Sequence, residues 1–288
     1  MNYFQPEKLE KALNFINEHK FVIAAGCTDL LPATENRSLS GNILDITNIR
    51  SLSGFSLDGK YRRIGATTTW SDIVNSNLPD CYEMLKDCGK EIGSIQIQNS
   101  GTIGGNLCNA SPAADTIPAL SVSNCIVKIV GPNGLREDLV KNVPIGPGKN
   151  SLKKGEFIKS ILIPNRPDYS SDSYIRFTPR SEMDIAVVSA ACFITLDKNE
   201  IIKDLKISLG AVAPTVIDIS GLDTIVKNSV LEDELLSKIS TICSKSCDPI
   251  DDKRGTIEFR SHVAGVLSKR AIILAHKRAG EKIEKITR

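Results

Sequence analysis

The sequence predicts an α+β protein of two lobes, and three observations support this prediction. The first fifty residues form the pattern of a small α/β unit, in which one amphipathic helix precedes two short apolar strands. A polar, proline-bearing segment, Asn165–Ser173, then divides the chain. Beyond it, strand-like runs precede two helical ones, an order typical of an α+β lobe with a small antiparallel sheet.

The composition is that of an ordinary soluble globular protein. The chain has 288 residues, 41% of them hydrophobic and 24% charged, which suffices for two compact lobes and a large core. The formal net charge of +2 gives no reason to expect a nucleic-acid partner. Basic residues do gather in 269–288, but acidic residues are mixed with them, so we interpret this stretch as a solvated helix face.

The same inventory predicts a cytoplasmic protein without a membrane partner. The first residues lack the basic and apolar regions of a signal peptide, and no apolar run approaches the roughly 20 residues of a membrane helix. The eight cysteines are therefore expected to be reduced, with no zinc or iron–sulfur spacing among them. Cys243 and Cys247 have the spacing of one helix face, with a disulfide as the alternative. Four others are expected to be core residues: Cys81, Cys88, Cys125 and Cys192.

The first α/β unit ends in a glycine turn. Apolar spacing predicts a helix over Glu7–Asn17 and strands over Phe21–Ala25 and Asn42–Ile46. Gly26 supplies the turn after the first strand, and Thr28 or Asp29 can cap the next turn of the chain. A strand followed by a Gly turn with exposed N–H groups suits a phosphate or pyrophosphate. The candidate binding residues of this loop are Ile23, Ala24, Ala25, Gly26, Cys27, Thr28, Asp29 and Leu30.

A second glycine loop lies near the middle of the first lobe. Three glycines within five residues free the backbone for positive φ, and successive N–H groups in such a turn can accept anionic oxygens. Asp115 follows and can receive hydroxyls or a ring N–H of the same ligand. A plain tight turn is the alternative, and neither loop has a dinucleotide-binding or Walker spacing. The candidate residues are Thr102, Ile103, Gly104, Gly105, Asn106 and Asp115.

The elements around this loop alternate between strands and helices. Thr69 is expected to cap a helix with Asp72, and Trp70 is expected in the core. Pro132 and Asn133 lie in a strong turn signal, and 144–148 is expected to be loop. The remaining predictions are strands at 61–66, 124–130 and 156–164 and a helix at 78–92.

The segment Asn165–Ser173 is the expected domain boundary. We predict a first domain of residues 1–167, with subdomains of about 1–55 and 56–167, and a second domain of residues 172–288. In the second domain, strands are expected at 173–177, 185–196 and 201–211, and helices at about 231–246 and 261–278.

The two glycine loops together resemble a known pair of signatures. A-A-G-C-T-D-L at Ala24–Leu30 and G-T-I-G-G-N-L-C-N-A-S-P-A-A-D at Gly101–Asp115 look like the FAD-binding signatures of the flavoprotein (medium) subunit of molybdenum hydroxylases. That family includes the xanthine dehydrogenase and carbon monoxide dehydrogenase subunits. Further matches occur in order at 173–186, 209–214 and 259–274, so the resemblance covers nearly the whole chain.

This resemblance implies a fold, a cofactor and partners. It implies a two-lobed FAD-binding domain of the vanillyl-alcohol-oxidase/PCMH type, followed by an α+β domain. FAD would be noncovalent, with Ile158 contacting it through its backbone and Arg176 lying where relatives usually carry Lys. The chain would relay electrons from two-iron iron–sulfur clusters on one partner subunit, which receive them from a molybdopterin subunit, to NAD or another acceptor.

Two departures from the family pattern concern the loops themselves. The family's first loop usually has a second Gly where this chain has Cys27, and a Cys fits there if the backbone does not need a positive φ. Gln98 replaces an Arg, which removes a cation near the cofactor.

Two other classes of function remain as alternatives. A self-contained flavoenzyme of the same fold, similar to UDP-N-acetylmuramate dehydrogenase, would carry its own catalytic Ser and Glu, and that pattern is not found. A nucleotide-binding module without redox function is the second alternative. A hydrolase has little support, because none of the three histidines, His19, His262 and His276, lies in a nucleophile–base context. No catalytic acid, base or metal ligand is assigned, since a flavin carries its own redox chemistry.

Overall fold

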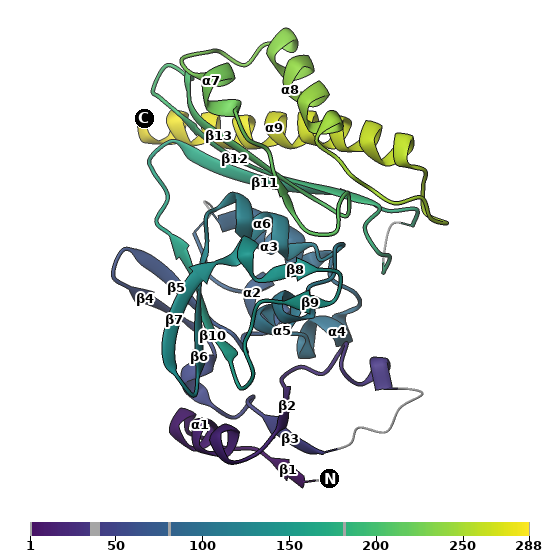
Figure 1. The fold of residues 1–288 in the computed structure, drawn as a ribbon. Coiled ribbons are helices and arrows are strands. Elements are labelled where there is room, and N and C mark those ends of the chain that lie inside the picture. Colours follow the sequence, from purple (N-terminus) through teal and green to yellow (C-terminus); the bar gives the residue numbers. More distant parts are fainter. Residues whose placement is uncertain (1, 35–40, 80–81, 181–182, 288) are drawn as a thin grey trace.

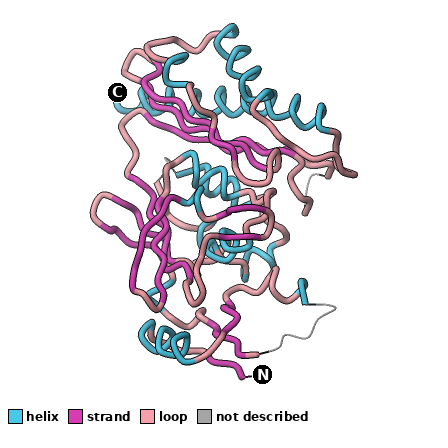
Figure 2. The backbone as a smooth tube through the Cα atoms, in the orientation of Figure 1, coloured by secondary structure: helices cyan, strands magenta, loops and turns pink. Residues whose placement is uncertain are grey.

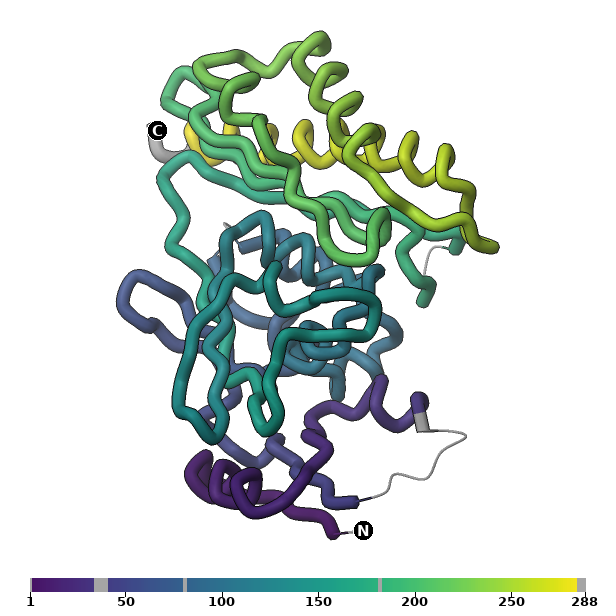
Figure 3. The backbone as a smooth tube through the Cα atoms, in the orientation of Figure 1, coloured from purple at the N-terminus to yellow at the C-terminus, as the bar shows by residue number. Residues whose placement is uncertain are grey.

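The computed structural model describes residues 2–34, 41–79, 82–180 and 183–287. Figure 1 shows three tiers stacked in chain order: an N-terminal unit, a central unit around a five-stranded sheet, and a C-terminal lobe in which a long helix lies along a second sheet. The colours of Figure 3 follow the chain from purple at one end of the molecule to yellow at the other. Helices and strands are mixed throughout (Figure 2), so the predicted α+β class is confirmed.

The N-terminal unit is a parallel sheet of order β1-β3-β2 with one helix beside it. The predicted helix and both predicted strands are present, whereas β1 was not predicted because three residues give no periodicity. Phe4 joins the sheet to the helix, with its ring centroid 4.8 Å from that of Phe15 and 5.5 Å from that of Phe21. The elements are β1 (Asn2–Phe4), α1 (Leu9–Glu18), β2 (Phe21–Ala24) and β3 (Asn42–Asp45).

The central unit is built on an antiparallel sheet of order β4-β5-β10-β6-β7. The predicted turn around Pro132 is a hairpin, since Gly131 pairs with Gly134 across it. The edge strands β4 and β7 were not predicted, because their side chains are largely exposed and mixed in polarity. The strands are β4 (Phe55–Asp58), β5 (Tyr61–Gly65), β6 (Ile126–Gly131), β7 (Gly134–Leu139) and β10 (Phe157–Pro164).

Short helices adjoin this sheet, and all of them except α4 contribute apolar side chains to its core. Thr69 and Asp72 form the predicted capping box, and Trp70 is 1% exposed, as predicted for a core residue. The helix predicted to begin at Leu78 begins at Glu83, because Pro79 disfavours helical backbone at the preceding residue. The elements are α2 (Trp70–Val74), α3 (Glu83–Lys90), α4 (Ile95–Ser100), α5 (Ile103–Asn109) and α6 (Thr116–Val122).

The segment predicted as loop after α6 contains a small sheet instead. Pro144–Gly146 forms β8, which pairs with β9 (Lys149–Asn150). Pro144 occupies the first position of its strand, where a missing N–H is tolerated. The proline and glycine content that predicted loop therefore marks the ends of very short strands.

The C-terminal lobe is an antiparallel sheet of order β11-β12-β13-β14 that is buried on both faces. In β12, Ala190, Cys192 and Ile194 contact the core beneath the helices of this lobe, while Ala191 and Phe193 contact the core of the central unit. Burial on both faces explains the unbroken apolar run of this strand. The predicted strand start at Ile185 is wrong by three residues, and the last helix is longer than predicted at both ends.

The bounds of the C-terminal elements complete the fold. Helices α8 and α9 pack against each other, and α9 also lies against β11 and β12 (Figure 1). The elements are β11 (Ser170–Phe177), β12 (Val188–Leu196), β13 (Ile202–Gly210), β14 (Ile217–Asp218), α7 (Leu222–Val226), α8 (Asp233–Lys245) and α9 (Ile257–Thr287).

The predicted linker Asn165–Ser173 is only partly a linker, because β11 begins at Ser170 and is buried. Two of its charged side chains, those of Arg166 and Asp172, are buried as a pair. Arg166 donates to Asp172 Oδ2 at 2.6 Å, and its guanidinium carbon lies 5.4 Å from the ring centroid of Tyr82 and 4.6 Å from that of Phe193. The N–H of Met84 in α3 donates to Asp172 Oδ1 at 3.0 Å. This seam joins the central unit to the C-terminal lobe.

Helix α9 closes the same seam from the other side. Arg278 donates to the carbonyl oxygen of Asp172 at 3.0 Å and to Asp87 Oδ2 at 2.9 Å, and Lys282 donates to the carbonyl oxygen of Ser170 at 2.9 Å. One end of α9 thus holds the first residues of β11 and a side chain of α3.

The cysteines behave largely as predicted. Cys88, Cys125 and Cys192 are buried, and all the cysteines in the described residues are free thiols. Cys81 lies outside the described residues. Cys247 lies just past the end of α8 and donates through Sγ to the carbonyl oxygen of Cys243 at 3.2 Å, in place of a disulfide.

Among the helices that the structure describes, none combines the length and the apolar character needed to cross a bilayer.

Candidate functional site

The first glycine loop leaves β2 where this strand ends beside β3. Ile23 and Ala24 belong to β2, and Ala24 pairs with Asp45. A Cβ built on Gly26 would lie 1.9 Å from the carbonyl oxygen of Ser100 and 3.0 Å from Cα of Gly101, so only glycine fits. The two glycine loops, far apart in the sequence, are therefore in direct contact.

Cys27 adopts a left-handed backbone conformation with φ of 59°. A Cys was expected to fit at this position only if the backbone did not need a positive φ, and the φ of Cys27 is positive. The left-handed conformation costs a residue with a Cβ about 1 kcal/mol. Burial raises the pKa of the Cys27 thiol, and the carboxylate of Asp45 raises it further. The thiol is therefore held in its protonated form beside a strained backbone.

Five consecutive backbone N–H groups in the first loop, from Gly26 to Leu30, have no hydrogen-bond acceptor among the described residues. A left-handed residue between right-handed or extended neighbours turns such N–H groups toward a common concave face. The expected side-chain cap by Thr28 or Asp29 is absent from the described part of the chain. Backbone bonds hold the next turn instead, from Leu31 N to Cys27 O and from Ala33 N to Asp29 O, both 3.1 Å.

The second glycine loop differs from its prediction, because its N–H groups are already used. Thr102 is the N-cap of α5, and its Oγ1 accepts from Gly105 N at 3.1 Å. Ile103 N donates to Thr68 O at 3.1 Å, and Gly104 N donates to Ala66 O at 2.9 Å. Neither Gly104 nor Gly105 takes a positive φ, since both lie inside the helix. The predicted anion-accepting nest is thus wrong for this segment.

The glycines of α5 serve close packing. A Cβ on Gly104 would lie 2.7 Å from Cβ of Ala66, and one on Gly105 would lie 2.8 Å from Thr102 Oγ1. Ala66 N in turn donates to the carbonyl oxygen of Lys159 at 3.1 Å, which is available because β10 has a bulge between Ile158 and Ser160. The side chain of Ile158 is 2% exposed, and its strand adjoins α5 through this bulge.

Asn106 also lies in α5, where it connects two helices. Its Oδ1 accepts from Thr116 Oγ1 in α6 at 2.5 Å. The polar groups of the predicted residues Thr102 to Asn106 therefore hold neighbouring elements together.

Asp115, at the start of α6, is buried with two partners from β11. Tyr174 donates its hydroxyl to Asp115 Oδ1 at 2.5 Å, and Arg176 Nη1 lies 3.2 Å from Oδ2. Burial raises the pKa of Asp115, while Arg176 and the Tyr174 hydrogen bond lower it. Burial also raises the pKa of Tyr174, with Asp115 adding to it. The structure thus brings the predicted residues Asp115 and Arg176 together across the seam.

Sequence reasoning missed a second carboxylate at Arg176. Glu91, the C-cap residue of α3, places Oε2 2.8 Å from Arg176 Nε. This is an ion pair outside hydrogen-bond geometry, so the buried Nε–H has no hydrogen-bond acceptor among the described residues. No spacing in the sequence relates Glu91 to Arg176. Gln98 donates to the carbonyl oxygen of Lys90 at 3.1 Å.

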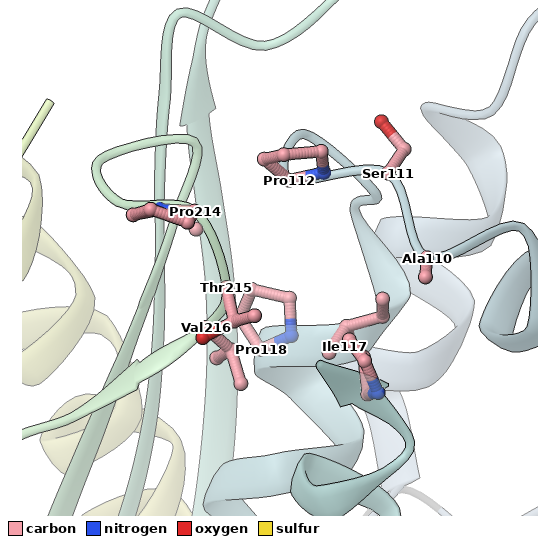
Figure 4. Close-up of a pocket in the computed structure, with 10 residues that line it drawn as sticks. Ala110, Ser111, Pro112, Ile117, Pro118, Pro214, Thr215 and Val216 are labelled. Carbon is pink, nitrogen blue, oxygen red and sulfur yellow. The ribbon is translucent and has the colours of Figure 1, made fainter. Parts of the chain in front are cut away.

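A small pocket opens at the seam near Asp115 (Figure 4). The segment Ala110–Pro112 lies on one side and Pro214–Val216 on the other, with Ile117 and Pro118 of α6 between them. Its walls are mostly apolar, and the hydroxyls of Ser111 and Thr215 are polar groups among them. The described residues contain no cluster of three or more His, Cys, Asp or Glu side chains arranged to hold a metal ion.

Two family models cover most of the chain. The FAD binding domain in molybdopterin dehydrogenase matches residues 1–166, and the CO dehydrogenase flavoprotein C-terminal domain matches residues 173–275. These define a flavoprotein-type subunit of two domains. The chain belongs to the family of FAD-binding medium subunits of molybdenum hydroxylases, of the carbon monoxide dehydrogenase and xanthine dehydrogenase type, whose members are oxidoreductase subunits.

Relatives align along nearly their whole length. The xanthine dehydrogenase FAD-binding subunit of Escherichia coli is 27% identical over 289 residues, covering 98% of both chains. The glyceraldehyde dehydrogenase medium chain of Sulfolobus acidocaldarius is 29% identical, covering 94% of this chain and 96% of its own. A solved structure, reconstituted CO dehydrogenase from Oligotropha carboxidovorans, superposes with a TM-score of 0.91 at 25% identity, covering 96% of this chain and 98% of that one.

Proposed function

We propose that this chain binds FAD noncovalently within a molybdenum hydroxylase complex and passes electrons from iron–sulfur clusters on a partner subunit to NAD or another acceptor. The observation that carries the proposal is the junction of the two glycine loops, where Gly26 meets Ser100 and the N–H groups from Gly26 to Leu30 lack acceptors among the described residues. Membership of an FAD-binding family supports the same cofactor.

The residues present fit FAD in three respects. The N–H groups of the first loop suit the two anionic phosphates of a pyrophosphate. Gly26 allows this loop to lie directly against the backbone of Ser100 in the second loop. Arg176 offers a buried Nε–H, without a hydrogen-bond acceptor in the described part of the chain, beside Asp115 at the start of α6. We propose that Ile23–Leu30 and Thr102–Asn106 border the nucleotide part, and that Asp115, Ile158 and Arg176 border the flavin part.

The chain's own task is then to bind FAD, to orient it and to set its reduction potential. FAD, when bound, supplies the redox chemistry. Asp115 and Arg176 set the charge beside it, and the seam residues hold the C-terminal lobe against the central unit. We place the boundary of the two domains between residues 167 and 172. The partners proposed are an iron–sulfur subunit and a molybdopterin subunit, in the cytoplasm.

A self-contained flavoenzyme is the competing proposal. The match of residues 173–275 to a CO dehydrogenase flavoprotein domain favours the relay over it. The two functions differ in an assay of the isolated chain. The relay predicts no turnover of xanthine, purines, nicotinate or aldehydes until partner subunits are added, whereas a self-contained enzyme turns its substrate over alone.

The test begins with the purified chain. We expect a yellow protein that releases FAD, not FMN, into the supernatant after acid precipitation, at about one per chain. Gly105→Val is expected to lose FAD while the far-ultraviolet circular dichroism stays unchanged, because its side chain meets Thr102 Oγ1. Flavin that remains in the pellet would contradict noncovalent binding. Identifying the proteins that copurify with the chain then tests the relay, which predicts an iron–sulfur subunit and a molybdopterin subunit among them.

A further inference from the structure

Arg176 lies between two carboxylates that come from different helices of the central unit. Its side chain is 5% exposed, that of Asp115 is 11% exposed, and that of Glu91 is 43% exposed. Asp115 contacts Nη1, and Glu91 contacts Nε at 2.8 Å. A third contact, from Nη1 to the carbonyl oxygen of Asp184 at 3.2 Å, fixes the guanidinium from within the C-terminal lobe.

The cluster carries one cation and two carboxylates. Asp115 is nearly buried and bonded to both Tyr174 and Arg176, so its position is fixed by two side chains. Glu91 is partly exposed. Its carboxylate lies close to Arg176 Nε but outside hydrogen-bond geometry, so the Nε–H has no well-directed acceptor. Glu91 is therefore a partly exposed partner of a buried cation and is not part of the buried core.

We propose that Glu91 is a positioning residue of the flavin site, which acts by holding Arg176 and partly neutralising its charge toward the cofactor. This inference rests on the proposed function, because it takes Arg176 to border the flavin. Reduction of a flavin by two electrons and one proton adds one negative charge. A cation beside the ring favours that change, and a carboxylate that neutralises the cation opposes it.

The experiment compares the reduction potential of bound FAD in Glu91→Gln and Glu83→Gln proteins. Glu83 is the matched control: it lies on the same helix, its side chain is 46% exposed, and it pairs with Arg278 in place of Arg176. We expect Glu91→Gln to shift the equilibrium about tenfold toward reduced flavin, which is about 30 mV for a two-electron couple. Glu83→Gln and Glu91→Asp are expected to stay near the wild-type potential.

A second background separates action through Arg176 from a direct effect of the Glu91 charge. In Arg176→Gln protein, Glu91→Gln is expected to change the potential by less than a third of its effect in the wild type. An equal shift in both backgrounds overturns the positioning role, as does a Glu91→Gln potential that matches that of Glu83→Gln. Loss of FAD by Glu91→Gln alone, with unchanged circular dichroism, supports it.

The outcomes also separate this inference from the proposed function. A wild-type chain that carries no FAD, and does not take it up when FAD is added, contradicts both. A wild-type chain with stoichiometric FAD whose potential is insensitive to Glu91 contradicts only the role of Glu91. Electron transfer to an artificial dye is not needed for either readout.

Discussion

Gly26 and Ser100 are in contact through backbone alone: a Cβ on Gly26 would overlap the Ser100 carbonyl oxygen at 1.9 Å. We expect Gly26→Ala to push the two loops apart, to destabilise the fold by about 1–3 kcal/mol as overpacking does, and to lower FAD retention at least tenfold. Thermal unfolding and flavin stoichiometry measure the two effects. Gly280→Ala in α9 is the control, because its Cβ comes no nearer than 3.4 Å to Glu200. Retention of stoichiometric FAD by Gly26→Ala would show that the contact is irrelevant to the cofactor.

Cys27 permits a test of backbone strain. At ordinary positions alanine gives the more stable protein than glycine, by roughly 0.5–1 kcal/mol. At Cys27, with φ of 59°, we expect the reverse order, so that Cys27→Gly unfolds at a higher temperature than Cys27→Ala. Both variants lose the thiol, so their difference reports the backbone alone. Equal melting temperatures, or a more stable alanine variant, would mean that the loop avoids this conformation in solution.

Arg166 is expected to be costly to remove. Its side chain is 7% exposed and pairs with Asp172 at 2.6 Å, so Arg166→Ala leaves a buried carboxylate without its cation. Loss of one partner of a buried pair costs about 3–5 kcal/mol. Arg180→Ala is the control, since Arg180 also pairs with an aspartate but its side chain is 72% exposed. Urea unfolding should show a much smaller change for Arg180→Ala, and comparable changes would contradict the role of burial.

The same pair predicts a pH dependence. Burial raises the pKa of Asp172 from 3.8 to about 6, and Arg166 only partly opposes this. The folded protein therefore binds a proton at Asp172 that the unfolded chain has lost, so this contribution to stability falls as pH rises from about 4 to about 6. Two pKa units correspond to roughly 3 kcal/mol.

Asp172→Asn isolates that contribution, because other carboxylates titrate in the same range. The difference in unfolding free energy between wild type and Asp172→Asn, measured from pH 4 to pH 7, should change in favour of the variant as pH rises. A difference that is constant with pH, or that changes in the opposite direction, would show that Asp172 is already ionised below pH 4 in the folded protein.

Local patterns predicted the elements well where one residue type decides the outcome. Thr69 with Asp72 predicted a capped helix, and Pro132 with its glycine neighbours predicted a turn, and both are present. The start of α3 was misplaced because the apolar spacing continues through Leu78, although Pro79 ends the helical conformation there. The spacing of apolar residues indicates which side chains are buried, whereas the start of a helix depends on the backbone conformation that each residue permits.

The candidate site was less predictable, because its arrangement depends on contacts between distant segments. Glycine spacing identified both loops but not that Gly104 packs on Ala66 or that the N–H groups of α5 are already used. The pairing of Arg176 with Glu91 joins a strand of one lobe to a helix end in another. The polar sequence of Asn165–Ser173 likewise suggested a linker, whereas the partners of Asp172 allow it to be buried in β11.

The hydrogen bond between α9 and β11 joins a late segment of the chain to an early one, which affects folding during synthesis. Lys282 bonds to Ser170, which lies 112 residues earlier in the chain. At roughly 5–20 residues per second, the ribosome makes β11 about 6–22 seconds before the helix that holds it. The glycine loops are made earlier still. During this interval the central unit has been synthesised but the C-terminal lobe is incomplete. The face of the central unit that contacts that lobe, including Met84 of α3, is therefore still exposed to solvent.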